Sequence, residues 1–300
     1  MGHHNRHFAG DAHVGIWGPP TSAANFCEED YAVTRFIAEF MNTLSNLAYV
    51  YFAFKYPGRS TQETSTISRL DSLSWGLLLV GLASGAFHAT LRQGPQFADD
   101  LSMLFLTGIM MQYIYCQNQP AGLSRVIAAA VWFSVASASL VYVHSGDIII
   151  HMSAFGASVA LIGVRLLQLI YRRQRPEQET AELAARFWTG AAYLAAAFAV
   201  WNADLELCVP LLRAQRQRVG WPWALALELH GWWHVLTAAG AAQMIQLVRS
   251  LCNNDQNGRK CQPNKEGSRR QRASPPSSAL HRGILPKESQ ADLERIGSSR

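Results

Sequence analysis

Charged residues are scarce in this sequence, and the shortage is uneven. Lys, Arg, Asp and Glu make up 16% of the 300 residues, whereas a soluble domain carries about 25%. Residues 251–300 hold 10 of the 26 basic and 5 of the 21 acidic residues, so this tail accounts for the whole net charge of +5. The first 250 residues are neutral. A body so poor in charge is not expected to be soluble, and the basic tail does not indicate that it binds nucleic acid.

Two further features are lacking. The first ten residues, MGHHNRHFAG, are polar and have no apolar core, so no cleavable signal peptide is predicted. His3, His4 and His7 could suggest a metal site there, but a flexible polar terminus is the preferred interpretation. No internal repeat or broken helix is evident, which argues against a transporter or channel.

Long uncharged runs dominate the rest of the chain. A helix needs roughly 20 mostly apolar residues to cross a bilayer. Six runs without Lys, Arg, Asp or Glu meet or approach that length: Ser72–Leu91, Leu101–Ser124, Val126–Gly146, Ile148–Val164, Phe187–Ala203 and Leu229–Val248. A seventh apolar stretch is interrupted only by Arg35 and Glu39. We predict an all-α integral membrane protein, a bundle of seven transmembrane helices over residues 33–55, 72–91, 101–118, 125–144, 147–171, 184–204 and 220–249.

The distribution of Lys and Arg between the loops predicts the orientation of these helices. One side carries the basic tail and Lys55, Arg59, Arg69, Arg125, Arg172, Arg173, Arg175 and Arg186. The other carries Arg6, Arg92, Arg213, Arg216 and Arg218. We therefore expect a lumenal or external N-terminus and a cytosolic C-terminus. The tail from about Asn253 is rich in Ser, Pro, Gln and Arg and is predicted to be disordered. It could contact anionic lipid, although a tail that only sets the topology is preferred.

Ionisable groups inside membrane spans are costly and point to function. His230 and His234 lie four residues apart in ELHGWWH, which places both imidazoles on one helix face. This spacing is frequent in metal sites. The alternative is two core histidines that face Trp232 or Trp233.

A second group lies in SGAFHATLRQGPQFADDLSM. His88 is near the end of its predicted helix, with Ser84 one turn earlier on the same face. Asp99 and Asp100 follow at the expected start of the next helix, where one of the two could be an N-cap. The predicted topology puts His88, Asp99 and the histidine pair at one depth.

Three histidines and a nearby acid are typical of a catalytic zinc site with an open fourth position. Such a zinc lowers the pKa of a bound water and polarises a carbonyl, and Asp99 could take and return the proton. The predicted fold therefore includes an intramembrane zinc site. His144 and His151 are rival ligands that rank lower, because they stand at helix ends without an acidic partner pattern.

An acidic segment precedes the first predicted helix, in NFCEEDYAVTRFIAEFMNTLSN. Hard oxygen ligands from a loop suit calcium, and the candidates are Asn25, Glu28, Asp30 and Glu39. The spacing is not that of an EF-hand, and a solvated helix start is the alternative. Within the helix, a polar stripe should point into the bundle: Glu39, Asn42, Thr43 and Asn46.

Together these motifs resemble the alkaline ceramidases, which belong to a superfamily of seven-helix membrane hydrolases that includes the adiponectin receptors. Several long motifs agree in family order across residues 14–250, whereas the tail lies outside the resemblance. They are GIWGPPTSAANFCEEDY (15–31), IAEFMNTLSN (37–46), SGAFHATL (84–91), QFADDLSM (96–103), WNADLELC (201–208) and HGWWHVLT (230–237).

The resemblance implies hydrolysis of the ceramide amide to a sphingoid base and a fatty acid. It implies zinc on His88, His230 and His234, with Asp99 as the acid/base and Ser84 near the oxyanion. It also implies a structural calcium on Asn25, Phe26 (through its carbonyl), Glu28, Asp30 and Glu39. The family often has Asp at position 25 and Asn at 30, so this chain swaps the two without changing the carboxylate count.

The predicted topology and the family resemblance indicate the location and oxidation state of each cysteine. Cys27 and Cys208 are both expected on the lumenal side, where disulfides persist, and a bridge between them fits the family. Cys252 and Cys261 should be cytosolic and reduced, and Cys116 a thiol within the membrane. Glu228 beside the histidine pair is expected to pair with an arginine of the preceding loop.

These inferences combine into one prediction for the whole chain. Residues 1–32 form a lumenal segment with the calcium ligands, 33–250 the catalytic membrane domain, and 251–300 the cytosolic tail. The predicted activity is a zinc-dependent ceramidase in the endoplasmic reticulum or Golgi membrane, acting on ceramide, phytoceramide or dihydroceramide. The alternative is a lipid sensor of the adiponectin-receptor type. The oligomeric state is not predicted.

Overall fold

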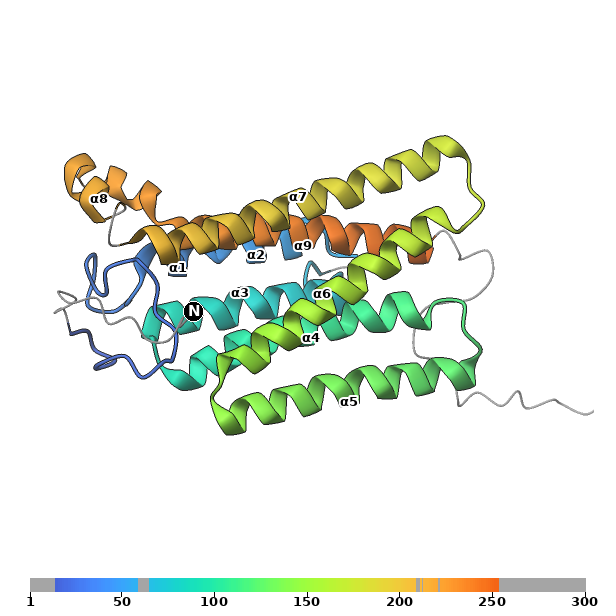
Figure 1. Ribbon diagram of the computed structural model, residues 1–300, viewed down its shortest axis with the longest axis horizontal. Coiled ribbons are helices and arrows are strands. Elements are labelled where there is room, and N and C mark those ends of the chain that lie inside the picture. The colour runs from blue at the N-terminus through green and yellow to red at the C-terminus, as the bar shows by residue number, and fades with distance from the viewer. Residues whose placement is uncertain (1–13, 59–64, 209–210, 212, 221, 254–300) are drawn as a thin grey trace, which may run out of the picture. The chain divides into compact units, whose positions relative to one another are not determined.

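The computed structural model describes residues 14–253 except 59–64, 209–210, 212 and 221. The predicted tail therefore lies almost wholly outside the described residues, as do His3, His4, His7 and Cys261. The described part is all-helical (Figure 1). Its helices are α1 (Phe40–Ser45), α2 (Leu47–Lys55), α3 (Ser72–Thr90), α4 (Gln93–Cys116), α5 (Ala121–Ser145), α6 (Ile148–Tyr171), α7 (Glu177–Leu207), α8 (Arg213–Val219), the 3₁₀-helix η2 (Trp223–Leu227) and α9 (Leu229–Asn253).

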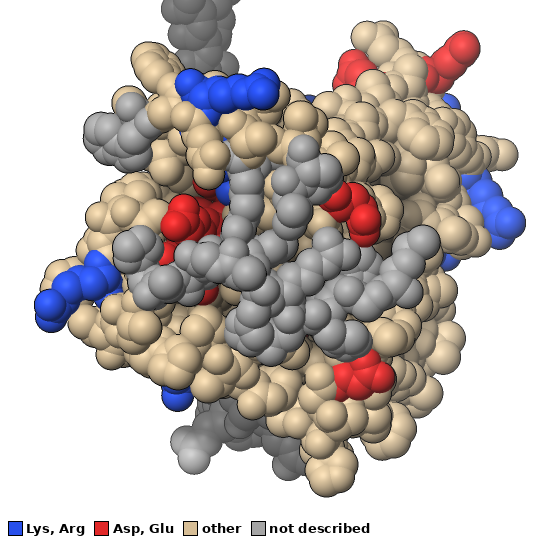
Figure 2. Space-filling model, turned by 60° about the vertical axis from the view of Figure 1, so that its left-hand side comes forward, with Lys and Arg blue, Asp and Glu red and all other residues tan. Residues whose placement is uncertain are grey.

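Five of the described helices are long and apolar enough to cross a membrane, so the chain is a multi-pass membrane protein. They are α3, α5, α6, α7 and α9. The two other predicted spans fall on α1 with α2, which are separated at Asn46, and on α4, which carries Asp99 and Asp100. A count of seven crossings stays a prediction. The face seen in Figure 2 is mostly uncharged, with scattered Lys, Arg, Asp and Glu side chains.

Among the long helices, α5 is the least covered by the rest of the protein. Tyr142 is its one buried side chain, whereas apolar side chains such as Val126, Phe133 and Leu140 are exposed. The helix packs only along α4 and α6 to any extent, as Figure 1 shows. An apolar helix with so little cover is suited to contact with lipid.

The apolar core joins the remaining long helices. Helix α7 runs along α9, and α3 runs along α4 (Figure 1). The α7–α9 contact is close because a glycine faces the partner helix: a Cβ at Gly240 would lie 2.9 Å from the Leu194 side chain. Small residues let membrane helices approach closely in this way. Core residues from successive helices are Tyr49, Leu77, Ile109, Leu166, Phe187 and Ile245.

Four predicted helix boundaries are corrected. Helix α7 begins at Glu177 rather than residue 184. The first helix begins at Phe40 rather than residue 33, because residues 14–39 form turns. Helix α4 begins at Gln93, so Asp99 and Asp100 lie in its second turn and neither is an N-cap. The last helix begins at Leu229 rather than residue 220, after α8 and η2.

The two ends of the bundle are fixed by different polar contacts. At the end where α9 finishes, Arg249 donates to both carboxylate oxygens of Asp71 at 3.0 and 2.6 Å and to the Tyr56 carbonyl at 2.7 Å. Asp71 also caps α3 by accepting from the Ser74 backbone N–H. This contact ties α9 to the connection between α2 and α3. The other end, where α3 finishes and α9 begins, carries the histidines and is called the histidine end below.

Candidate metal centre and active site

Three histidines meet inside the histidine end of the bundle. His88 comes from the last turns of α3, and His230 and His234 come from the first turns of α9. Their candidate ligand nitrogens all lie within 4.8 Å of one another, and each residue is at most 3% exposed. The predicted i, i+4 pair and the distant His88 are thus brought together. This group could hold a metal ion.

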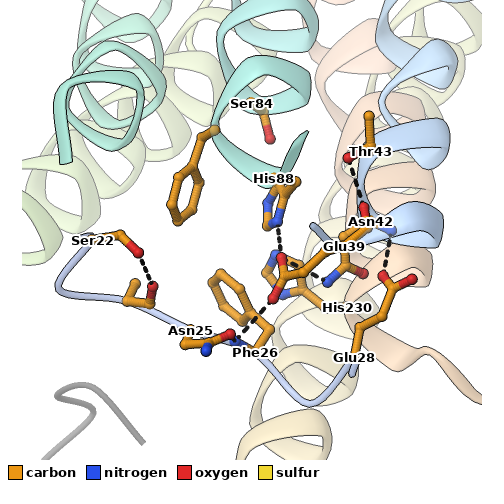
Figure 3. A network of polar contacts seen from close by, with 12 residues as sticks. Ser22, Asn25, Phe26, Glu28, Glu39, Asn42, Thr43, Ser84, His88 and His230 are labelled. Carbon is orange, nitrogen blue, oxygen red and sulfur yellow. Dashed lines mark hydrogen bonds and ion pairs between the residues drawn. The ribbon is translucent and has the colours of Figure 1, made fainter. Parts of the chain in front are cut away.

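The ring nitrogen Nδ1 of His88 is paired with Oε2 of Glu39 (Figure 3). Glu39 is fully buried at the N-cap of α1, where its backbone N–H also donates to the His88 carbonyl at 2.9 Å. A carboxylate on Nδ1 favours the tautomer that carries the proton there. The lone pair of Nε2 is then available to a metal.

His234 is oriented by a hydroxyl in the same manner. Ser45 Oγ lies 2.8 Å from His234 Nδ1 and donates to the Asn42 carbonyl at 2.9 Å. Because the Ser45 hydroxyl proton is used on that carbonyl, the oxygen is left to accept from His234 Nδ1–H. This assignment again leaves Nε2 free. Helix α1 therefore supplies the partners of two histidines.

His230 is fixed by its backbone and by stacking. Its N–H donates to Asp204 Oδ1 at 3.3 Å. The Phe26 ring lies on its imidazole with centroids 3.5 Å apart and planes inclined by 22°. Its Nδ1 has no hydrogen-bond partner among the described residues. An unpartnered nitrogen on a buried imidazole fits a group that binds a metal.

Ser84 and Asp99 lie beside this group. Ser84 is one turn before His88 on α3 (Figure 3), with Oγ 3.5 Å from His234 Nε2. Asp99, which is half-buried in the second turn of α4, lies close enough to Ser84 for its carboxylate to interact with the hydroxyl. Three helices, α3, α4 and α9, thus bring together three imidazoles, a hydroxyl and a carboxylate, the set of groups that metal-assisted hydrolysis requires. The rivals lie elsewhere: His144 is exposed, and His151 contacts Asp100.

The sequence matches the family described as Ceramidase over residues 18–268. The chain belongs to the ceramidase family. An alkaline ceramidase of Saccharomyces cerevisiae is 29% identical over 238 residues, 75% of each chain. Alkaline ceramidase 3 of Mus musculus is 28% identical over 231 residues, 76% of this chain and 82% of the relative. Alkaline ceramidase 1 of Homo sapiens is 24% identical over 226 residues, 74% of this chain and 79% of the relative.

The family match also sets the extent of the resemblance. It reaches residue 268, so the prediction that the likeness ends at residue 250 is corrected. It spans every helix described above and all three histidines of the group. The ceramidase match therefore covers the membrane body and the first part of the basic tail.

The N-terminal segment of this ceramidase-family chain is fastened to the last helices. Cys27 forms a disulfide with Cys208, at the end of α7. The Cys27 N–H donates to Asp204 Oδ2 at 3.0 Å, and Arg216 donates to the Cys27 carbonyl at 2.7 Å. Arg216 also pairs with Glu228 at 2.6 Å, which confirms the predicted partner of this acid. The contacts hold Phe26 over His230.

Two buried carboxyls in this region have raised pKa values. Burial is the main cause that brings the pKa of Glu228 to about 9, although Arg216 opposes it. Burial also brings the pKa of Glu28 to about 8, and the nearby Glu39 carboxylate adds to the increase. The Glu28 oxygens accept from the N–H groups of Met41 and Asn42 at 2.6 and 2.8 Å. Glu28 thus binds the first turn of α1.

Of the residues predicted to bind calcium, Asn25 and Glu39 both accept from the Phe26 N–H, at 2.8 and 3.3 Å (Figure 3). Glu39 also faces His88, and Glu28 binds α1. Asp30 is buried. Across the described residues, the one group of three or more His, Cys, Asp or Glu side chains close enough for a metal is the histidine group. The calcium site stays a prediction.

Sequence reasoning missed two residues that orient histidines. Asp204 directly follows the uncharged run that ends at Ala203, so it was placed at a helix end rather than inside the membrane body. It is fully buried and joins Cys27 to His230. Ser45 lies one position before Asn46 of the predicted polar stripe. Of the four residues of the stripe, Glu39, Asn42 and Asn46 are buried, and Thr43 is partly buried.

Ser45 offers a test of how the histidines are oriented. Replacing Ser45 with Ala removes the acceptor for His234 Nδ1–H, and we expect metal affinity to fall by about 10- to 100-fold. Ser45→Thr keeps the hydroxyl and should bind almost as the natural chain does. Titration of metal-free protein with zinc measures both affinities. Equal affinities for the Ala and Thr variants would contradict the assigned role.

Proposed function

We propose that this chain is a zinc-dependent ceramidase, which hydrolyses the amide bond of ceramide to a sphingoid base and a free fatty acid. The observation that carries the proposal is the buried group of three histidine nitrogens within 4.8 Å, beside Ser84 and Asp99, in a ceramidase-family chain. Three imidazoles with an open fourth position are the ligand set of hydrolytic zinc. The names of the curated relatives support the substrate class.

The donor set fits zinc. Glu39 and Ser45 occupy Nδ1 of His88 and His234, which leaves Nε2 of both rings for the ion, while Nδ1 of His230 has no partner among the described residues. A bound zinc ion would activate water and polarise the amide carbonyl. The neutral imidazole is the form of histidine that binds a metal.

The residues of the chain supply the proton transfers. Asp99 accepts a proton from the water that adds to the amide carbon, then delivers it to the nitrogen of the departing sphingoid amine as the C–N bond breaks. Ser84 stands between Asp99 and His234, where its hydroxyl can donate to the oxygen that becomes negative. The products are one carboxylic acid and one amine, so the step consumes one water.

The surroundings suit a lipid substrate. The helices around the site are apolar on their outer surface, and ceramide would reach the histidines sideways from the bilayer with its amide at their depth.

We place the histidine end and the N-terminus on the lumenal side and the basic tail in the cytosol, in endoplasmic reticulum or Golgi membrane, from the distribution of Lys and Arg. Calcium at the N-terminal segment is a further expectation. A sensor of the adiponectin-receptor type is not favoured, because the curated relatives are named as ceramidases.

A lipid-panel assay tests the proposal. Purified protein is given labelled ceramide, dihydroceramide and phytoceramide, before and after treatment with a zinc chelator. We expect release of fatty acid from at least one of the three lipids, loss of release after chelation, and recovery when zinc is added back. Binding of ceramide without any turnover would instead select the sensor.

A further inference from the structure

A second buried polar network lies next to the site, and the reaction described above does not use it. Asp100 is 7% exposed, and its Oδ2 accepts a hydrogen bond from Tyr142 Oη. Its Oδ1 lies 3.6 Å from His151 Nε2, an electrostatic contact rather than a hydrogen bond. Tyr142 and His151 are 0% and 3% exposed. The network joins the first turns of α4 to the end of α5 and the start of α6.

The two partners of Asp100 are held rigidly with respect to each other. They flank the tight turn between α5 and α6, where Gly146 adopts a left-handed conformation with φ +69 and donates to the Tyr142 carbonyl at 2.8 Å. Asp147 then caps α6 by accepting from the Ile149 N–H at 2.9 Å. Because α5 ends in a left-handed glycine cap and α6 begins directly after an N-cap, the two helices have little freedom to move relative to each other.

The burial pattern of α5 is unusual and centres on this network. Tyr142 is the one buried side chain of a 25-residue helix whose other residues are exposed or partly exposed. Its hydroxyl is directed at Asp100, and its ring contacts Phe97 of α4 edge-on at 5.1 Å. Burying a carboxylate, a phenol and an imidazole together is costly compared with apolar side chains of similar volume. Such networks select one orientation of the elements that carry them.

The rotation of α4 is the property that this network controls. Asp99 and Asp100 are neighbours in one helix and point about 100° apart around its axis. Fixing Asp100 toward α5 and α6 therefore directs Asp99 toward Ser84 and the histidines. One turn before Asp100 on the same face of α4, Gln96 Oε1 accepts from the Ala23 N–H at 2.7 Å, so these turns are also held by the N-terminal segment.

We propose that Tyr142 and His151 are positioning residues for Asp99, which act through Asp100 by fixing the rotation of the first turns of α4. The inference rests on the proposed role of Asp99 in ceramide hydrolysis. Neither residue reaches the reacting atoms. The outermost helix of the bundle thus contributes to catalysis through one hydroxyl.

The test compares two tyrosines whose hydroxyls both connect α4 to its neighbours. Tyr142→Phe removes the hydroxyl at Asp100 and keeps the ring packing. Tyr115→Phe, the matched control, removes a hydroxyl of α4 that donates to the Leu161 carbonyl of α6 at 3.2 Å, far along the helix from Asp99. We expect Tyr142→Phe to lower kcat for ceramide about tenfold with KM within about twofold. Tyr115→Phe should leave kcat unchanged, and both variants should keep the natural metal content.

His151 gives a second, independent measurement. His151→Ala should lower kcat, and His151→Gln, which retains an N–H that can reach Asp100, should recover most of it. Equal kcat values for Tyr142→Phe and Tyr115→Phe, or equal losses in the Ala and Gln variants, would overturn the inference. An unaltered chain that fails to hydrolyse ceramide would instead overturn the proposed function, whereas an Asp99→Asn variant that hydrolyses it normally would overturn the role of Asp99 on which the inference rests.

Discussion

Asp99→Asn is expected to lower the rate of ceramide hydrolysis by about 10³-fold, within the range of roughly 10² to 10⁴ that a general acid–base contributes. Asparagine has the size of aspartate and can still hydrogen-bond to Ser84, so the packing of α4 should persist. It cannot take a proton from water or deliver one to the leaving amine. Purified variant and natural protein would be compared by kcat for ceramide, with metal content and melting temperature measured on the same samples.

Asp147→Asn is the matched control for this prediction. Asp147 lies at the same end of the bundle and caps α6, and asparagine caps a helix about as well as aspartate. The Asp147→Asn variant should therefore hydrolyse ceramide at the natural rate. A folded, metal-loaded Asp99→Asn variant with a nearly normal kcat would remove Asp99 from the mechanism and leave the zinc site to be reconsidered separately.

His230→Gln is expected to abolish metal retention through purification and to lower hydrolysis at least about 10³-fold, because it deletes one of three ligands. His230 is the most informative ligand to replace. Its ring Nδ1 has no hydrogen-bond partner among the described residues, so a glutamine of similar size disturbs few other contacts. The backbone N–H that donates to Asp204 remains. Metal per protein, measured by elemental analysis, and kcat would be followed together.

His144→Gln tests whether any lost imidazole has the same effect. His144 is exposed in the last turn of α5, and its replacement should leave both metal content and rate unchanged. If His230→Gln keeps a full complement of zinc and its activity, the three histidines do not form the zinc site, even though they lie together.

The group of three histidines could be predicted from the sequence because two separate patterns agreed. The i, i+4 spacing fixed the relation of His230 to His234, and the alternation of membrane spans placed His88 at the same depth. The start of α4 could not be predicted in this way. Gly94 and Pro95 suggest a turn, but proline is tolerated in the first turn of a helix, where its missing N–H has no partner to lose. The helix therefore begins at Gln93 and carries Asp99 inside it.

The residues that orient the ligands were harder to predict for a different reason. Ser45 reaches His234 across 189 positions of sequence, and Asp204 joins His230, 26 positions away, to Cys27, 177 positions away. No local period links such residues, since their contacts depend on how α1 and α7 pack beside α9. Hydrophobic runs predict where helices lie in the sequence, but they do not predict which face of each helix is buried. Tyr142 shows the same limit, because α5 is apolar on every side and nothing in its pattern marks the buried face.

The histidine centre has a consequence for biosynthesis. One ligand lies in α3 and two lie in α9, the last helix described, and the Phe26 ring that covers His230 comes from the N-terminal segment. A nascent chain that has inserted every helix up to α7 holds one of the three histidines. In the proposed mechanism, metal loading is then a late event, and ceramide hydrolysis cannot begin before α9 has entered the bilayer.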